Sequence, residues 1–237
     1  MDNGTHRPQF LLVHGAWHGA WCWRDVQDAL SDRGWNSHAV TLPSVVPEGA
    51  GGSLPGMHAD ARVIRERVDS IDAPLVVVGH SYGGAPVTQA TAGAAHVSHL
   101  VYVAAFALDE GESLMTCFGG EQPALATVRG VIPVREDPAG TLYHDVPDHQ
   151  RDPALARLLP QSALSFAEPV DRAGWKTIPS TYIVCDDDRS LPPSYQLPFA
   201  ERATVTRHLP SGHTPLLSMP GKLADLLDEI AHTTEER

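Results

Sequence analysis

Leu75-Val76-Val77-Val78-Gly79-His80-Ser81-Tyr82-Gly83 is the stretch of this sequence that says most about its fold. The four apolar residues at its start form a run typical of a strand buried on both faces. Gly79 and Gly83 lack a Cβ, so a following helix can pass close to that strand. The stretch therefore predicts a buried strand, a tight turn centred on Ser81, and a helix over about residues 82–92.

A Gly-x-Ser-x-Gly turn between a strand and a helix is typical of a nucleophile elbow. In such a turn the serine takes a strained backbone conformation that holds its hydroxyl above the sheet. The alternative is an ordinary tight loop, because the pattern is short and its residues are common. The context along the chain has to decide between the two.

Apolar runs and amphipathic helices alternate through much of the chain. In the helix at 57–71, polar residues including Asp60 fill the positions between the apolar ones. This alternation predicts an α/β fold, a mostly parallel, doubly wound sheet with helices on both faces. Besides the stretch above, the predicted strands are 10–13, 37–42, 100–106, 181–185 and 204–209, and the predicted helices are 23–30, 57–71, 192–203 and 222–232.

Residues 107–175 break the alternation. They hold seven prolines and only a weak helical period at 154–159. A disordered linker is the alternative, but Leu, Phe, Val and Trp are spread through the segment and favour a packed, irregular lid. We therefore expect a core of residues 1–106 and 176–237 with an inserted cap at 107–175.

Length and charge narrow the classes of function. The 237 residues suit one domain with an insertion, and a formal charge of −12 disfavours nucleic acid or an anionic membrane as a partner. The polar start and the short apolar stretch at 10–13 predict neither a signal peptide nor a membrane span, so the expected location is the cytoplasm. Cys22, Cys117 and Cys185 fit no disulfide framework and are expected to be buried apolar residues.

A serine nucleophile needs a base, an acid that orients the base, and donors for the oxyanion. In an elbow fold the chain order is serine, acid, histidine, with the acid and histidine following later strands. His213 comes directly after the last predicted strand and is the candidate base. The acid has to come from Asp186-Asp187-Asp188, and the spacing does not choose among the three.

The turn His14-Gly15-Ala16-Trp17 follows the first strand and completes the set. It can aim the Ala16 N–H at a carbonyl oxygen, paired with the N–H of Tyr82 after the serine. Four elements thus occur in the expected order, each at the end of a strand, and together they favour a catalytic Ser81.

Metal and nucleotide sites are not indicated. Among thirteen histidines, His14 and His18 are four apart, but they lie on a glycine-rich turn without a Cys-x-x-Cys or His-x-His partner. No Gly-x-Gly-x-x-Gly or Walker-type loop is present in the sequence. We expect no metal and no cofactor.

The sequence resembles the α/β-hydrolase superfamily, and within it the plant methyl-ester esterases and hydroxynitrile lyases with their small bacterial esterase relatives. The resemblance covers roughly the first 106 residues and about the last 60, and it fades through the cap. It implies that Asp188 is the triad aspartate. The motifs that carry it are Phe10-Leu11-Leu12-Val13-His14-Gly15-Ala16-Trp17-His18-Gly19-Ala20-Trp21-Cys22-Trp23, Val78-Gly79-His80-Ser81-Tyr82-Gly83-Gly84 and Tyr182-Ile183-Val184-Cys185 with Asp186-Asp187-Asp188-Arg189-Ser190-Leu191-Pro192.

Two positions separate esterases from lyases in this group. The lyases carry a threonine where this chain has Gly15, and a lysine where it has Thr214. Without that lysine no cation stabilises departing cyanide, so the resemblance implies hydrolysis instead of cyanohydrin cleavage. Many plant esterases have a methionine in place of Thr214, which implies a changed pocket floor.

The sequence predicts a cofactor-free serine hydrolase that cleaves a small, partly apolar carboxylic ester through Ser81, His213 and Asp188, with the Ala16 and Tyr82 amides as oxyanion donors. Two alternatives stay open. One is another reaction on the same triad, such as lactone or C–C bond hydrolysis or a tailoring step of specialised metabolism. The other is a small-molecule receptor that retains the fold.

Overall fold

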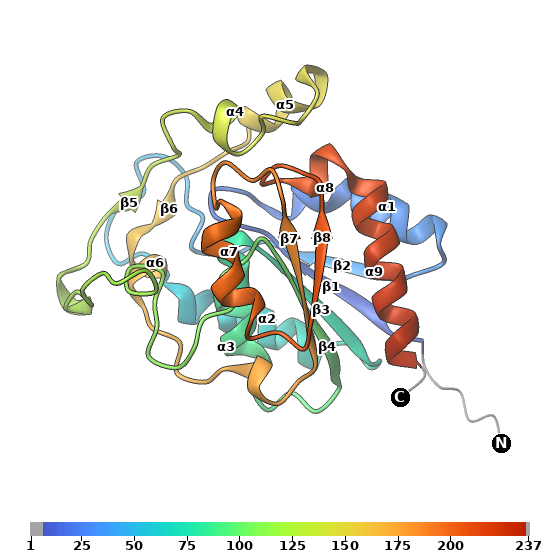
Figure 1. Ribbon diagram of the computed structural model, residues 1–237. Coiled ribbons are helices and arrows are strands. Elements are labelled where there is room, and N and C mark those ends of the chain that lie inside the picture. The colour runs from blue at the N-terminus through green and yellow to red at the C-terminus, as the bar shows by residue number, and fades with distance from the viewer. Residues whose placement is uncertain (1–6, 236–237) are drawn as a thin grey trace.

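A parallel sheet of six strands forms the centre of the computed structural model, which describes residues 7–235 (Figure 1). The chain runs outward from β1 to β2 and then returns to β3 on the other side of β1, so β1 and β3 flank the point where the winding direction reverses. Ligands of such sheets bind beyond the carboxyl ends of the strands at that point. In sheet order the strands are β2 (Ser37–Val40), β1 (Gln9–Val13), β3 (Leu75–His80), β4 (Val97–Val103), β7 (Ser180–Cys185) and β8 (Val205–Leu209), and every neighbouring pair is parallel.

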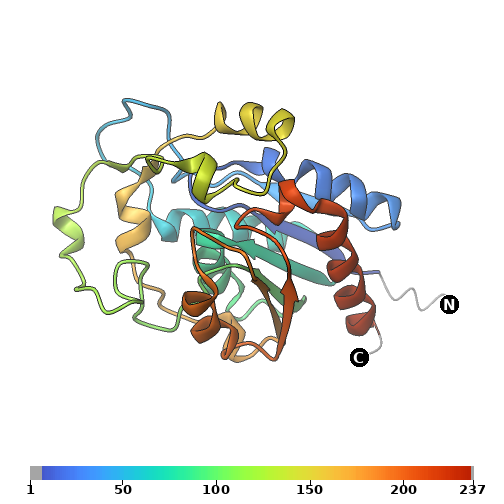
Figure 2. The same cartoon turned by 45° about the horizontal axis from the view of Figure 1, so that its top comes forward.

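Helices cover both faces of the sheet, as Figures 1 and 2 show. Alternate residues of β1 illustrate the two layers, since Phe10 and Leu12 pack with α1 and α9, whereas Leu11 and Val13 pack with α2 and α3. The predicted doubly wound α/β fold is confirmed. The α-helices are α1 (Arg24–Asp32), α2 (Met57–Asp69), α3 (Gly84–Thr91), α4 (Pro138–Thr141), α5 (Asp148–Leu155), α6 (Ala163–Ala167), α7 (Pro193–Ala200), α8 (Pro215–Ser218) and α9 (Pro220–Glu235), with short 3-10 turns at Ala20–Trp23, Ser81–Gly83, Leu125–Thr127 and Gly174–Lys176.

Two predicted elements are displaced by three residues or more at both ends. The strand expected at 100–106 is β4, Val97–Val103, because Ala104 takes a φ of 43° and turns the chain so that the Phe106 N–H donates to the Ser81 carbonyl. The weak helical period at 154–159 corresponds to α5, Asp148–Leu155, which ends earlier because the chain then leaves the helix and the Leu159 N–H donates to the Trp17 carbonyl. In both cases a distant hydrogen bond overrides the local apolar pattern.

Asp60 is a further correction. The sequence predicts it among the polar positions between the apolar residues of the helix at 57–71. It lies on α2, but it is completely buried. The signal was present in its spacing, because Asp60 lies three residues after Met57 and four before Ile64, on the apolar face. A carboxyl on that face has to find hydrogen-bond donors inside the protein.

Residues 107–175, between β4 and β7, contribute no strand to the large sheet, and we call this segment the insertion. It contains a two-stranded antiparallel sheet, β5 (Val131–Ile132) with β6 (Gln161–Ser162), and the short helices α4, α5 and α6. Leu142, Tyr143 and Val146 are buried in it, so the segment is packed and irregular. Figure 1 shows α4 and α5 beyond the upper ends of β7 and β8.

Cys22 and Cys185 are buried as predicted, and Cys117 is partly exposed. None of the helices between residues 7 and 235 combines the length and the apolar character that crossing a membrane requires. The polar amino-terminal residues Met1 to His6, on which the expected location partly rests, lie outside the described residues.

Candidate active site

Ser81 follows directly on β3 and has a φ of 51°, a left-handed conformation that non-glycine residues rarely adopt. The turn requires its glycines. A Cβ on Gly79 would lie 3.0 Å from the Gly83 carbonyl oxygen, and a Cβ on Gly83 would lie 2.5 Å from the carbonyl oxygen of His14. The elbow therefore fits tightly against the loop after β1, and the Ser81 side chain lies at the carboxyl edge of the sheet.

His213 and Asp188 complete a hydrogen-bonded series with Ser81. The Ser81 Oγ lies 3.0 Å from His213 Nε2, and His213 Nδ1 lies 2.7 Å from Asp188 Oδ2. All three residues are buried or nearly so, with exposed fractions of 9%, 3% and 4% for Ser81, His213 and Asp188. With Nδ1–H donating to the carboxylate, Nε2 is left to accept the serine proton, which is the arrangement that general-base activation of a serine requires.

The structure brings only one of the three candidate aspartates to His213. Asp186 accepts from His208 Nδ1 at 2.7 Å on an exposed part of the surface, and the Asp187 side chain is exposed. Asp188 is the member whose side chain turns inward. Of the three, Asp188 is therefore the one in contact with the His213 ring.

The loop that carries Asp188 is itself held in place. Asp188 Oδ1 accepts from the N–H groups of Ser190 at 2.7 Å and Leu191 at 2.8 Å. Gln196, buried on α7, donates to the Leu191 carbonyl at 2.7 Å and to Asp188 Oδ2 at 3.3 Å. Gln196 carries no sequence motif and could not be predicted, because it reaches Asp188 only through the packing of α7 on β7.

His14 to Gly19, which we call the oxyanion loop, connects β1 to the first helical turn. Ala16 and Tyr82, whose amides are the predicted oxyanion donors, both line the cavity that contains Ser81 and His213. Trp17, the next residue, has a φ of 66°. The loop is therefore strained at the residue after the expected donor.

Three buried histidines support this region. Burial lowers the pKa of His14 to about 4 and that of His18 to about 3, and it holds the pKa of His80 well below its usual value. The His14 ring bonds the Gly15 carbonyl and the Leu42 N–H, and the His18 ring bonds the Ala16 carbonyl and the Tyr143 hydroxyl. A neutral imidazole has one donor and one acceptor nitrogen, so His14 and His18 can each bond a carbonyl oxygen and a hydrogen-bond donor at the same time. Both residues therefore hold neighbouring segments of the chain together.

The insertion anchors the site at three points that sequence reasoning did not find. The Tyr143 hydroxyl lies 2.7 Å from His18 Nε2, and Asp145 Oδ2 accepts from the Gly212 N–H at 2.6 Å. The Thr214 hydroxyl donates to the Leu142 carbonyl at 2.8 Å, so Thr214 anchors the segment after His213, and it is not among the residues lining the cavity.

The cavity around Ser81 has a volume of about 380 Å³, within the range of small-molecule sites. Its wall is mostly aromatic and aliphatic, and its lining contains no acidic side chain. Arg135 lies at its edge, with the guanidinium 5.9 Å from the Trp17 ring centre. The lining comprises Ala16, Trp17, Ser81, Tyr82, Phe106, Leu114, Phe118, Arg135, Phe166, Ser190, Leu191, Pro192, Tyr195 and His213.

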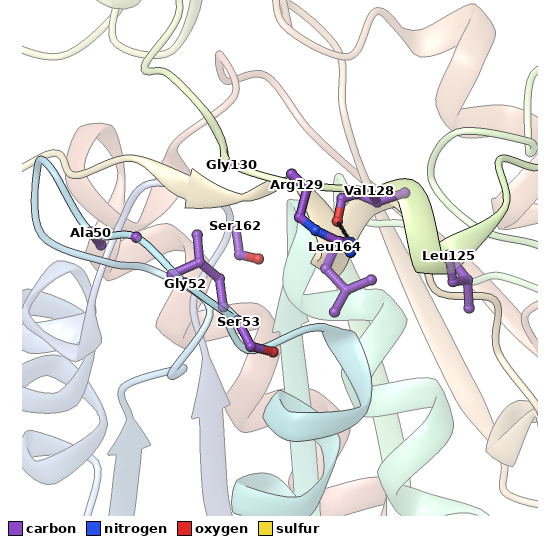
Figure 3. Close-up of a pocket in the computed structure, with 11 residues that line it drawn as sticks. Ala50, Gly52, Ser53, Leu125, Val128, Arg129, Gly130, Ser162 and Leu164 are labelled. Carbon is purple, nitrogen blue, oxygen red and sulfur yellow. Dashed lines mark hydrogen bonds between the residues drawn. The ribbon is translucent and has the colours of Figure 1, made fainter.

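A second cavity of about 550 Å³ lies between the loop at 50–54 and the insertion (Figure 3). Ser162 and Leu164 contribute to it from β6 and α6, and Arg129 contributes from the segment just before β5. None of Ser81, Asp188 and His213 lines it. Ser81 and His213 line the smaller cavity instead.

Among the described residues, no group of three or more His, Cys, Asp or Glu side chains is arranged to hold a metal ion. His14 and His18, the pair that sequence spacing raised, each use both ring nitrogens in the hydrogen bonds given above.

Comparison with known proteins agrees with this geometry. The family model described as alpha/beta hydrolase family matches residues 10–226. The chain is 32% identical to a carbendazim hydrolyzing esterase from Nocardioides sp., over 92% of this chain and 97% of that protein, and 25% identical to methylesterase 1 from Arabidopsis thaliana, over 98% of each. The solved structure of a pyrethroid hydrolase from Sphingobium faniae superposes with a TM-score of 0.80 at 25% identity, over 97% of this chain and 99% of that chain. The resemblance expected from the motifs is confirmed, and the chain belongs to the alpha/beta hydrolase family.

Proposed function

We propose that this protein is a serine hydrolase that cleaves carboxylic esters through an acyl-enzyme. The observation that carries the proposal is the series Ser81 Oγ, His213 Nε2, His213 Nδ1 and Asp188 Oδ2, with separations of 3.0 and 2.7 Å, on a serine held at a φ of 51°. Esterases among the similar proteins support the same reaction class.

In the first half of the reaction, Ser81 Oγ attacks the ester carbonyl carbon while its proton passes to His213 Nε2. The carbonyl oxygen gains the negative charge, and the N–H groups of Ala16 and Tyr82 bind it. Each such donor is worth about 10²–10³ in kcat. The bond between the carbonyl carbon and the alcohol oxygen then breaks, and His213 returns its proton to the departing alcohol.

In the second half, water takes the place of the alcohol. His213 Nε2 accepts a proton from the water as its oxygen attacks the acyl carbon, and the same two amides bind the new oxyanion. The bond to Ser81 Oγ breaks, the serine recovers its proton from His213, and a carboxylic acid leaves. Asp188 stays ionised and keeps the imidazole in the tautomer that both halves need.

The cavity favours a small ester with an apolar part. Phe106, Phe118, Phe166 and Tyr195 offer aromatic surface, and burial of apolar groups against such walls supplies most of the binding free energy of small ligands. A volume of about 380 Å³ limits the size of the substrate. Residues from both the core and the insertion line it, in keeping with a cap at 107–175 that selects the substrate.

The expected partner is thus a small-molecule ester, and we propose that no metal or cofactor takes part. The cytoplasmic location and the absence of nucleic-acid binding are predictions from charge and from the amino-terminal sequence.

A covalent label tests the proposal directly. Paraoxon should transfer its diethylphosphoryl group to Ser81 Oγ with release of p-nitrophenolate, and mass spectrometry of the digested protein should find the adduct on the peptide that contains Ser81. The Ser81→Ala protein should remain unlabelled. Labelling of the Ser81→Ala protein at the wild-type rate would refute the assignment.

A further inference from the structure

A buried carboxyl lies behind the oxyanion loop, outside the proposed triad. Asp60 Oδ1 accepts from the Ser44 N–H at 2.9 Å, and Asp60 Oδ2 accepts from the hydroxyl groups of Ser44 and Tyr82. Burial raises the pKa of Asp60 to about 7, and the nearby Glu168 acts in the same direction. A buried carboxyl with three donors is fixed in position, because each donor lost would leave it poorly solvated.

Gln161 extends this arrangement from Ser44 to the oxyanion loop. Its Nε2 donates to Ser44 Oγ at 2.6 Å and to Ser165 Oγ at 2.9 Å, while its Oε1 accepts from the Trp17 N–H at 3.2 Å. Gln161 is on β6 of the insertion, and its side chain is completely buried. Its neighbour Ser162 points to the second cavity in Figure 3, so the two residues face opposite sides of the strand.

The peptide unit between Ala16 and Trp17 is held at both ends. Its carbonyl oxygen accepts from His18 Nδ1 at 2.7 Å, and its N–H donates to Gln161. The Trp17 carbonyl in turn accepts from the Leu159 N–H at 3.0 Å. A positive φ, as at Trp17, is unfavourable for a residue other than glycine and persists only where the surroundings enforce it. Gln161 and Leu159, both from the insertion, help to hold Trp17 in this conformation through their hydrogen bonds to its N–H and carbonyl groups.

We propose that Gln161 is a positioning residue for the oxyanion hole, fixed by Asp60 through Ser44. Its hydrogen bond to the Trp17 N–H fixes the peptide unit between Ala16 and Trp17. That peptide unit adjoins the Ala16 N–H, which is the proposed oxyanion donor. This proposal rests on the proposed function, because it assigns the Ala16 amide to the oxyanion. It also gives the insertion a role in catalysis besides that of covering the substrate.

The test compares two glutamine variants. Gln161→Met retains the length of the side chain and removes its hydrogen bonds. Gln89→Met is the matched control, since Gln89 Oε1 likewise accepts from the main chain of a distant segment, the Asp171 N–H at 2.7 Å, but lies away from the cavity. With p-nitrophenyl butyrate we expect Gln161→Met to lower kcat by about 10- to 100-fold with KM within about threefold, because a donor displaced by about 1 Å costs on that order. Gln89→Met should retain wild-type kcat.

Hydrogen exchange gives a readout that does not depend on turnover. Gln161→Met should speed amide exchange in the peptide covering residues 14–19, and Gln89→Met should not. Wild-type exchange in that peptide together with wild-type kcat would overturn the proposal, and so would an equal loss of kcat in both variants. Paraoxon labelling of Ser81 reports on the proposed function separately, so the two hypotheses can fail independently.

Asp60→Asn serves as a second variant if Gln161→Met does not fold. Asparagine retains the shape and one acceptor oxygen, but it replaces the carboxyl oxygen, Oδ2, that both hydroxyl groups contact. We expect a smaller fall in kcat, about three- to tenfold, with faster exchange over residues 14–19. A folded Asp60→Asn protein with wild-type kcat and wild-type exchange would overturn the proposal as well.

Discussion

His80, the residue before the proposed nucleophile, also holds the proposed base. Its Nε2 donates to the main-chain carbonyl of His213 at 2.8 Å, and the two imidazole rings lie 4.9 Å apart between centroids. The elbow and the loop after β8 are thereby joined directly, which helps to fix the separation of Ser81 and His213.

We therefore predict that His80→Ala lowers kcat and stability together. The variant loses a buried hydrogen bond and leaves a cavity, which should reduce the free energy of unfolding by about 2–4 kcal/mol. Loosening of His213 should lower kcat by about 10-fold or more. Urea unfolding and ester hydrolysis measure the two effects, and a stable variant with wild-type kcat would contradict this role.

Asp188→Asn should lower kcat by about 10³–10⁴-fold with little effect on folding, because the neutral amide no longer favours the productive imidazole tautomer. Asp186→Asn is the matched control. Asp186 belongs to the same acidic run but pairs with His208 on the surface, so the control should retain wild-type kcat. Equal effects of the two substitutions would contradict the choice of Asp188.

Gly15→Ala tests how closely the oxyanion loop fits the elbow. The added Cβ would lie 2.9 Å from Ser81 Cβ and 3.0 Å from His80 Nδ1, so one of the two must shift. We expect kcat to fall by about 10- to 100-fold. Gly221→Ala on α9 places its Cβ in open space and should leave kcat unchanged, and a Gly15→Ala enzyme that also retained wild-type kcat would show that the fit is loose.

Stability should fall as the pH drops below about 6.5. The pKa of His14 is lowered to about 4 and that of His18 to about 3, with His80 also well below 6.5, so unfolding takes up protons on these rings at lower pH. Asp60 acts in the opposite direction between about pH 4 and 7, since burial raises its pKa to about 7 and its proton is lost on unfolding.

On unfolding, the three histidines take up more protons than Asp60 releases. From these groups we expect the free energy of unfolding to fall by about 3 kcal/mol per unit decrease in pH near pH 5. Denaturant unfolding at several pH values measures this slope. Asp60→Asn should steepen this dependence on pH, because the variant no longer has the Asp60 proton that is released on unfolding. A free energy of unfolding that stayed level from pH 6.5 to 4.5 would contradict the neutral, buried state of the histidines.

The sequence predicted the parts of the site that lie at strand ends. Ser81 and Ala16 follow apolar runs, and His213 follows the last predicted strand. Parallel strands bring their carboxyl ends to one edge, so order along the chain sufficed to group the three residues. Asp188 needed the family resemblance, because its two neighbours have the same chemistry and only side-chain direction distinguishes them.

The supporting residues depend on contacts that no local pattern encodes. Gln161 lies in a segment without periodicity and reaches Trp17 across 144 positions of sequence. Asp60 is an intermediate case, since helical spacing places it on the buried face, although nothing in the sequence identifies its partners. The short helices of the insertion, of four, eight and five residues, are too short to show a clear helical period in the sequence.

Hydrolysis of p-nitrophenyl butyrate by the Ser81→Ala protein tests the central claim most directly. The variant removes only the Oγ that lies 3.0 Å from His213 Nε2, and circular dichroism establishes that it is folded. We predict that the wild-type protein turns over and that kcat of the variant falls by at least about 10³-fold. A folded Ser81→Ala protein that hydrolyses the ester within a few fold of the wild-type rate would contradict the account.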